Sequence, residues 1–201
     1  MSLAETSTPQ HPARRKLSKT GLREKIMHAA AELFAAEGYA SVSMRKIGQR
    51  IGYTPMSIYL HFKDKDDLLD CVCERAFADL YRRHERVDAE SGDASERLKG
   101  GMRTFIDFAL QNPSYYRATF TRSGEAMPRR DLIRQRTVAL KREQVAAFLG
   151  ASASMDEIEA ATQVVIAAEN GVATLLTANP KLEPKKMIEA VIATVVRGLR
   201  G

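Results

Sequence analysis

The feature that most constrains the fold of this chain is a pair of short helix-forming segments within residues 43–62. Ser43 can cap the first helix, and Gly52 ends it. Thr54 followed by Pro55 is a cap with proline at the first helical position, so a second helix begins a few residues later. The first helix carries one apolar stripe, formed by Met44, Ile47 and Ile51. This spacing predicts a helix-turn-helix.

The second helix of this pair carries apolar residues on both of its sides. At about 100° per residue, Ile58 and Phe62 fall on one side, whereas Met56, Ser57 and Leu60 face the other way. A small globular core gives no reason to direct Met and Leu outward from so short a helix. A helix in the major groove of DNA does, because its outer face meets base edges and thymine methyl groups. We therefore predict that this helix binds double-stranded DNA.

The positive charge of the chain is concentrated near its N-terminus. Up to Lys65 there are 11 Lys and Arg residues against 5 Asp and Glu residues, whereas the remainder has 20 of each. The whole formal charge of +6 therefore falls in the first third of the chain. This asymmetry indicates a nucleic-acid-binding end joined to an electrically neutral end.

The composition is that of an ordinary soluble domain, with 44% hydrophobic and 28% charged residues. No run of residues approaches the roughly 20 apolar positions that a membrane-spanning helix needs. The N-terminus also lacks the apolar core of a signal peptide. We expect a cytoplasmic protein that does not associate with membranes.

Catalytic and metal-binding motifs are missing from the sequence. It has no nucleophile elbow, no phosphate-binding glycine loop, no paired carboxylates in an apolar setting and no His/Cys cluster at ligand spacing. We therefore expect neither an enzyme nor a cofactor or metal. Cys71 and Cys73 lie two residues apart on a predicted helix and point in different directions, which disfavours a mutual disulfide. They are either small buried hydrophobes or part of a redox or metal switch.

Residues 1–19 are predicted to form a disordered, basic tail, because they are polar and contain almost no apolar side chains. Arg14-Arg15-Lys16 forms a short basic cluster near its end. This cluster either follows DNA phosphates or enters a minor groove as an arm, or it is a solvated leader with only nonspecific attraction.

The apolar residues after the tail recur at helical spacing, and no alternating β pattern competes with them. We predict an all-α protein of about nine helices, with a DNA-binding domain in residues 20–66 and a helical dimerisation and ligand-binding domain in residues 67–201. The fourth helix is expected to end near His84, before a polar linker or bend over residues 85–95. Later breaks are expected at Asn112-Pro113, Ser123-Gly124, Gly150 and Asn179-Pro180.

Residues 20–70 resemble the DNA-binding domain of the TetR family of bacterial regulators. The resemblance is carried, in order, by Ala30-Ala31-Glu32-Leu33-Phe34, Glu37-Gly38-Tyr39, Ser43, Ile47-Gly48, Gly52-Tyr53-Thr54, Ile58-Tyr59-Leu60-His61-Phe62 and Lys65. It implies a helical N-terminal domain that binds DNA and a helical remainder that dimerises and senses a ligand.

The resemblance also implies roles for single residues. Those expected to contact phosphates are Ser43, Arg45, Tyr59 and Lys65, and those expected to approach bases are Thr54, Pro55, Met56 and Ser57. Lys46 would oppose its helix dipole at a cost of a few tenths of a kcal/mol, which a nearby phosphate would offset. His61 completes this surface. We interpret it as packing support rather than a metal ligand, because no second ligand accompanies it at suitable spacing.

The C-terminal half offers a weaker pattern. Asn112-Pro113-Ser114-Tyr115-Tyr116-Arg117 and the segment Gly171 to Leu175 resemble a C-terminal domain of part of the TetR family, named for Trp, His and Gly. Here Gly171 is present, Asn170 takes the His place and the chain has no Trp. The predicted ligand pocket mixes apolar walls with a few polar groups, although each residue would also suit a core. Its candidates are Phe105, Tyr115, Tyr116, Phe120, Phe148 and Asn170.

The sequence thus predicts a ligand-responsive transcriptional regulator, which we expect to be a repressor released from DNA by an unidentified small molecule. A palindromic operator would be read by a homodimer, because one short recognition helix reads only a few base pairs. The Val-, Ile- and Ala-rich stripes of the last two helices are either the dimer interface or simply core. The alternative function is a nonspecific architectural DNA-binding protein, which would show no palindromic preference.

Overall fold

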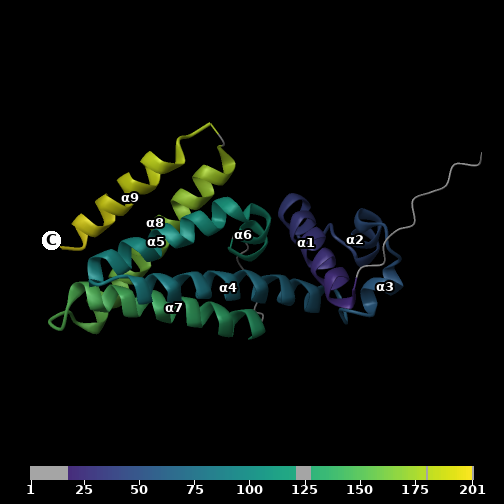
Figure 1. The fold of residues 1–201 in the computed structure, drawn as a ribbon, viewed down its shortest axis with the longest axis horizontal. Helices are drawn as coiled ribbons and strands as arrows, with labels where there is room; N and C mark the ends of the chain where they lie inside the picture. The colour runs from purple at the N-terminus through teal and green to yellow at the C-terminus, as the bar shows by residue number, and fades with distance from the viewer. Residues whose placement is uncertain (1–17, 121–127, 180, 201) are drawn as a thin grey trace, which may run out of the picture.

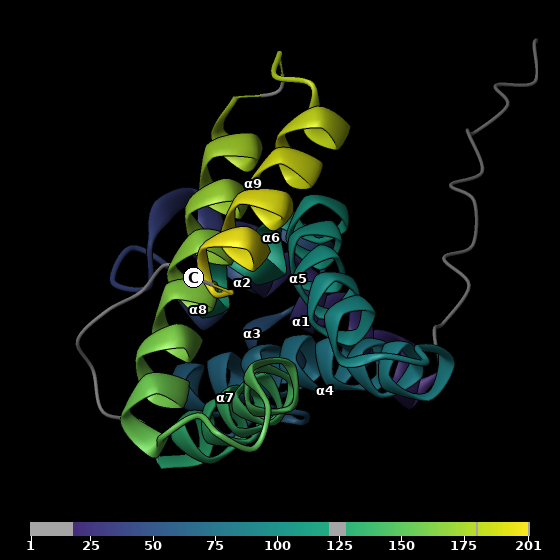
Figure 2. The same cartoon turned by 90° about the vertical axis from the view of Figure 1, so that its left-hand side faces the viewer.

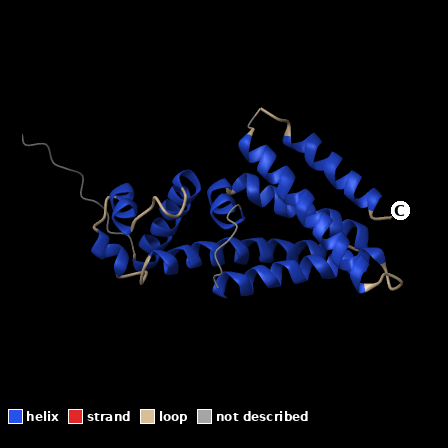
Figure 3. Cartoon of the chain, turned by 180° about the vertical axis from the view of Figure 1, so that it is seen from behind, coloured by secondary structure: helices blue, strands red, loops and turns tan. Residues whose placement is uncertain are grey.

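The computed structural model describes residues 18–120, 128–179 and 181–200, with the backbone alone given for 128–134. Within these ranges the only regular secondary structure is helical, and there is no strand (Figures 1 and 3). The nine helices are α1 (Lys19–Glu37), α2 (Met44–Ile51), α3 (Pro55–Tyr59), α4 (Lys65–Glu90), α5 (Ala94–Gln111), α6 (Pro113–Phe120), α7 (Pro128–Leu149), α8 (Met155–Ala178) and α9 (Pro184–Gly198). The predicted all-α fold and helix count are confirmed. The break at Ser123-Gly124, Pro180 and residues 1–17 of the predicted tail lie outside the described residues, whereas Lys19, the last residue of that tail, is the first residue of α1.

Helices α1 to α3 and the first half of α4 share one apolar core. Ser18 caps α1, because its Oγ accepts a hydrogen bond from the backbone N–H of Gly21 at 3.1 Å. Asp64 caps α4 in the same way, accepting from the backbone N–H of Asp67 at 2.8 Å. The fully buried side chains of this core include Ile26, Ala30, Ile47, Ile58, Leu68 and Val72. The N-terminal helices are therefore fixed to the start of α4 as one unit.

Helix α4 is longer than the sequence pattern predicted, and it runs from the N-terminal helices deep into the rest of the molecule (Figure 1). The linker or bend predicted over residues 85–95 is confirmed only as a bend at residues 91–93, because α4 continues to Glu90 and α5 begins at Ala94. Tertiary contacts hold this polar stretch in the helix. Val87 packs against Gly100 of α5, and Asp88 accepts a hydrogen bond from Nε2 of Gln144 in α7 at 2.9 Å.

The remaining helices enclose a second core around α5, which contacts α4, α6, α7, α8 and α9. Helix α7 lies beside α4, and α8 and α9 pack together along one flank of the molecule (Figure 2). Ser154 and Glu157 form the predicted capping box at the start of α8. Among the described residues, no helix is both long and apolar enough to span a bilayer.

Helix α6 connects the two cores. Ala118 is buried in the N-terminal core against α1, and Tyr115 and Phe120 pack against both cores. The ring of Phe120 meets Phe77 of α4 edge-on at a centroid distance of 4.9 Å. A change in the packing of α6 would therefore act on α1 and on α4 together.

Candidate nucleic-acid interface

The turn between α2 and α3 is a Schellman motif. Gly52 has φ 74° and ψ 38°, and its N–H donates to the carbonyl oxygen of Gln49 at 3.3 Å. The N–H of Tyr53 donates to the carbonyl oxygen of Gly48 at 2.9 Å. Thr54 then caps α3, because its Oγ1 accepts from the N–H of Ser57 at 3.3 Å. The predicted helix-turn-helix is therefore confirmed in its local geometry.

Gly48 allows the two helices to approach each other. A Cβ at this position would lie 2.7 Å from the carbonyl oxygen of Tyr53, a backbone atom that cannot move aside independently. We expect Gly48→Ala to lower the free energy of unfolding by about 1–3 kcal/mol, as overpacking does. Thermal denaturation measures this loss. The control is Gly92→Ala in the exposed bend between α4 and α5, where an added Cβ would meet nothing within 4 Å. Equal stability of the two variants would contradict the role of Gly48.

Helix α3 exposes the face predicted to meet DNA. Ile58 and Phe62 are 0% and 1% exposed and fix the helix to the core, whereas Met56 and Leu60 are 69% and 74% exposed. Tyr59 is 51% exposed at the edge of the same face. Met56 and Leu60 are large apolar side chains exposed to solvent. Such exposure indicates that a binding partner covers this surface.

The start of α2 combines a cap with an exposed positive charge. Ser43 Oγ accepts from the N–H of Lys46 at 3.2 Å, and Arg45 is exposed, with no ion-pair partner in the described part of the chain. The Nζ of Lys46 pairs with the carboxylate of Glu37 at the end of α1. The ion pair with Glu37 therefore offsets the unfavourable interaction of Lys46 with the dipole of α2, and no phosphate is needed for this.

Lys65 has a structural role in addition to the predicted phosphate contact. Its Nζ donates to the carbonyl oxygens of Tyr39 and Val42, both at 2.9 Å, and lies 3.9 Å from the ring centroid of Tyr39. The Tyr39 hydroxyl in turn contacts the carboxylate of Asp66. These contacts fix the loop that presents the α2 cap.

His61 lies half-buried beside α3. The pKa of its imidazole is lowered by burial and by the positive charges of Lys19 and Arg23. At neutral pH it therefore presents an uncharged ring, which agrees with packing support and disfavours an ionic phosphate contact. In the described ranges, no group of three or more His, Cys, Asp or Glu side chains could hold a metal ion.

Two basic residues near this surface, Lys63 and Arg50, were not among the predicted DNA contacts. Lys63 is exposed in the loop between α3 and α4, and its backbone N–H donates to Asp67 Oδ2 at 2.9 Å. The sequence feature that could have indicated Lys63 is its position directly after the helix predicted to face DNA. Arg50 was also left out, and it pairs with Glu32 of α1 at 3.3 Å.

The predicted ligand-pocket residues do not all come together. Phe105, Tyr116 and Phe120 form an aromatic cluster with centroid distances of 5.2 to 6.1 Å, and the Tyr116 hydroxyl donates to the carbonyl oxygen of Asn170 at 3.2 Å. Tyr115 instead stacks beside His28 of α1. Phe148 lies under the guanidinium of Arg200 at the C-terminal end of the chain.

A groove of about 700 Å³, which the sequence did not predict, lies between α4 and α7. Phe77, Ala78 and Tyr81 line it from α4, and Ala139 and Leu140 line it from α7. Because Phe77 also touches Phe120, the groove and the aromatic cluster share a wall.

Both cysteines are buried, and Cys71 Sγ accepts a hydrogen bond from Arg23 Nη2 at 3.0 Å. Burial raises the pKa of the Cys71 thiol, although Arg23 acts in the opposite direction. A buried, protonated thiol is a poor nucleophile, which favours packing over the redox alternative.

A helix-turn-helix with an exposed apolar and basic surface, joined by a long helix to a second helical core, defines a DNA-binding protein with a separate C-terminal helical domain. Sequence comparison gives the same result. The family described as "Bacterial regulatory proteins, tetR family" matches residues 26–72, and "Tetracyclin repressor-like, C-terminal domain" matches residues 98–199. The chain therefore belongs to the TetR family of bacterial regulatory proteins. The Trp-His-Gly subtype stays a prediction.

Individual relatives cover the chain to different extents. The nucleoid occlusion factor SlmA of Vibrio vulnificus is 29% identical over 100 residues, which are 49% of this chain and 51% of SlmA. The HTH-type transcriptional activator FasR of Mycolicibacterium smegmatis is 28% identical over 105 residues, which are 52% of this chain and 48% of FasR. The chain thus spans about half the length of the curated relatives it matches.

A solved structure matches over a greater length. The fatty acid degradation regulator FadR from Bacillus halodurans has a TM-score of 0.77 and 19% identity, covering 92% of this chain and 99% of FadR. At this identity the likeness shows a common fold. The arrangement of both domains described above therefore occurs in this solved structure as well.

Proposed function

We propose that this protein is a ligand-responsive repressor that binds a palindromic operator as a homodimer and leaves it when a small molecule binds. The observation that carries the proposal is the exposed face of α3, where Met56, Tyr59 and Leu60 stand in solvent on a helix of five residues. In the major groove, Met56, Ser57 and the start of the helix would meet bases. Ser43, Arg45 and Tyr59 would meet phosphates on either side.

The dimer interface is proposed on the outer faces of α8 and α9. One side of α8 is exposed along its length and carries small or apolar residues three or four positions apart: Ala160, Val164, Ala167, Gly171 and Leu175. A Cβ at Gly171 would meet nothing within the chain, so the close approach that glycine permits is unused here. A partner helix packed on this face would use it.

A charge placed in this face tests the interface. We expect Val164→Arg, at a residue 51% exposed, to shift the protein toward monomer at micromolar concentration, because the guanidinium would have to be desolvated in the dimer. Light scattering measures the mass. The matched control is Ala147→Arg in an exposed position of α7, which should leave the mass unchanged. A wild-type protein that is monomeric at this concentration would contradict the proposed dimer.

The effector is proposed to bind in the groove between α4 and α7. Its floor residue Phe77 contacts Phe120 of α6, and α6 packs on α1 of the DNA-binding domain. A ligand that repositions Phe77 would therefore alter α6 and the angle of α4. Operator affinity then changes by the difference in ligand affinity between the two arrangements.

Selection of bound sites from random duplex DNA tests the function. The repressor proposal expects an inverted repeat with half-sites about 34 Å apart or a multiple of that distance. A pool without a consensus, bound with the same affinity as the selected sequences at moderate salt, would instead support the architectural alternative. Repression is then tested by a reporter placed downstream of the selected site.

A further inference from the structure

Helix α3 carries the two most exposed large apolar side chains of the described residues, Leu60 at 74% and Met56 at 69%. They are four residues apart, so they lie on the same face of the helix. Of these two, only Met56 was among the predicted base contacts. The backbone at Leu60 is held in place, because its N–H donates to the carbonyl oxygen of Met56 at 3.2 Å. The buried Phe62 follows, and its N–H donates to the carbonyl oxygen of Ile58 at 3.1 Å.

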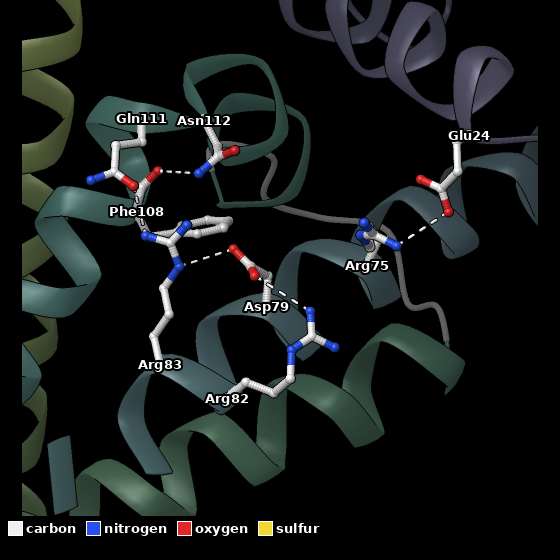
Figure 4. Close-up of polar contacts among 8 residues, drawn as sticks. All are labelled: Glu24, Arg75, Asp79, Arg82, Arg83, Phe108, Gln111 and Asn112. Carbon is white, nitrogen blue, oxygen red and sulfur yellow. Dashed lines mark hydrogen bonds and ion pairs between the residues drawn. The ribbon is translucent and has the colours of Figure 1, made fainter. Parts of the chain in front are cut away.

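The outer face of α3 lacks the side chains that recognise bases through paired hydrogen bonds. Residues 54–60 contain no Arg, Lys, Asn, Gln, Asp or Glu. The hydroxyl groups of Thr54 and Ser57 are hydrogen-bonded to each other at 2.9 Å. Helix α4, by contrast, carries charged side chains such as Arg75 and Arg83, which form hydrogen bonds with neighbouring helices (Figure 4). The outer face of α3 is therefore suited to apolar contact with bases.

The major groove offers one apolar group to such a face. The edges of guanine, cytosine and adenine present hydrogen-bond donors and acceptors, whereas thymine adds a C5-methyl group. Leucine forms no hydrogen bond through its side chain, so it contributes to binding only when its apolar surface leaves water. Against a donor or acceptor, Leu60 would exclude water without replacing the lost hydrogen bond, which costs free energy. Against a thymine methyl group it buries apolar surface on both sides.

We propose that Leu60 selects thymine in each operator half-site by covering its C5-methyl group, and that Met56 covers the methyl group of a second thymine. This inference rests on the proposed function, because it requires α3 to lie in the major groove of an operator. Four residues of helix extend about 6 Å. Successive base pairs lie about 3.4 Å apart, so the two thymines should be separated by about two base-pair steps.

Replacing single thymines of the selected operator with deoxyuridine tests the proposal, because uracil lacks the methyl group and keeps the hydrogen-bonding groups of thymine. Burial of one methyl group contributes about fourfold to affinity, so removing the two symmetry-related methyl groups of a palindrome should weaken binding about 15-fold. We expect this loss at one thymine position for Leu60 and at another for Met56. Fluorescence anisotropy with each modified duplex measures the affinity.

Leu60→Ala identifies the side chain that contacts the methyl group. In this variant, deoxyuridine at the Leu60 position should change affinity by less than about twofold, because the shorter side chain no longer covers the methyl group. The loss at the Met56 position should persist. Thermal stability should be unchanged, since Leu60 is 74% exposed. The matched control is Met155→Ala at the start of α8, which removes a side chain 67% exposed and should leave all these affinities unchanged.

The result distinguishes failure of this inference from failure of the proposed function. A selection that returns no consensus contradicts the palindromic operator, and the assignment of Leu60 is overturned with it. If an operator is selected and bound, the assignment of Leu60 alone is overturned by either of two results. One is that deoxyuridine at every thymine position leaves the affinity unchanged. The other is that Leu60→Ala shows the same losses as the wild type at every position.

Discussion

Replacing Lys141 with methionine is expected to lower the free energy of unfolding by about 3–5 kcal/mol, because it removes one partner of a buried ion pair. Lys141 Nζ of α7 lies 2.6 Å from Glu169 Oε1 of α8, and the two side chains are only 4% and 2% exposed. Methionine keeps the volume but leaves a carboxylate in an apolar interior. Chemical denaturation at pH 8 measures the loss.

The destabilisation should depend on pH. Burial raises the pKa of Glu169 to about 7, although Lys141 acts in the opposite direction. Below the ordinary carboxyl pKa, Glu169 is neutral in both the folded and the unfolded state, so its burial carries no charge penalty. As pH rises from about 4.5 to about 7, the unfolded chain releases this proton more readily than the folded chain, and stability is lost. Above about 7 the carboxyl group is ionised in both states, and the loss levels off. Without Lys141, the loss between pH 5 and pH 8 should be larger than in the wild type.

Two further variants complete this test. Lys141→Met combined with Glu169→Leu should recover most of the lost stability, because no charge then remains buried. Lys186 pairs with Glu183 on the surface, where the side chains are 81% and 63% exposed. Lys186→Met should therefore change stability by less than about 1 kcal/mol. A Lys141→Met protein as stable as Lys186→Met at pH 8 would show that the pair does not form.

Arg45→Gln is expected to weaken operator binding by about 100-fold or more without changing thermal stability. One charge-assisted contact contributes about 1.5–3 kcal/mol, and the proposed dimer would lose two of them. The side chain of Arg45 is exposed at the start of α2, so the fold does not depend on it. The slope of log K against log salt should also fall by about 2, because two phosphate contacts disappear.

The control for Arg45 is Arg142→Gln, which removes the same charge from an exposed position of α7. If the effect of Arg45 came only from net charge, both variants would lose affinity equally. Unchanged operator binding by Arg45→Gln would remove Arg45 from the proposed interface. Fluorescence anisotropy with the selected operator at several salt concentrations gives both the affinity and the slope.

The local signals of the DNA-binding domain were readable in the sequence because each acts within a few residues. Ser43 and Thr54 cap their helices, and Gly52 takes the left-handed conformation that ends α2. The exposed positions of Met56 and Leu60 follow from helical periodicity once the start of α3 is fixed.

Longer-range pairings could not be predicted, since sequence distance does not encode which helices meet. Lys46 forms a salt bridge with Glu37 of the preceding helix, and Phe148 lies beside the guanidinium of Arg200, which is 52 residues further along the chain. The groove between α4 and α7 is lined by residues 74–82 of one helix and 136–143 of the other, and no local residue pattern marks it.

By itself the sequence determined the helical elements, the helix-turn-helix and the concentration of positive charge, because caps, periodicity and charge are local properties. Only the tertiary structure decided how far α4 extends, since the polar residues 85–90 remain helical through the contacts of Val87 and Asp88 with α5 and α7. It also decided that Lys141 and Glu169, 28 residues apart, share one buried site. A charge can enter the interior only beside its counter-charge, and the packing of the helices supplies that neighbour.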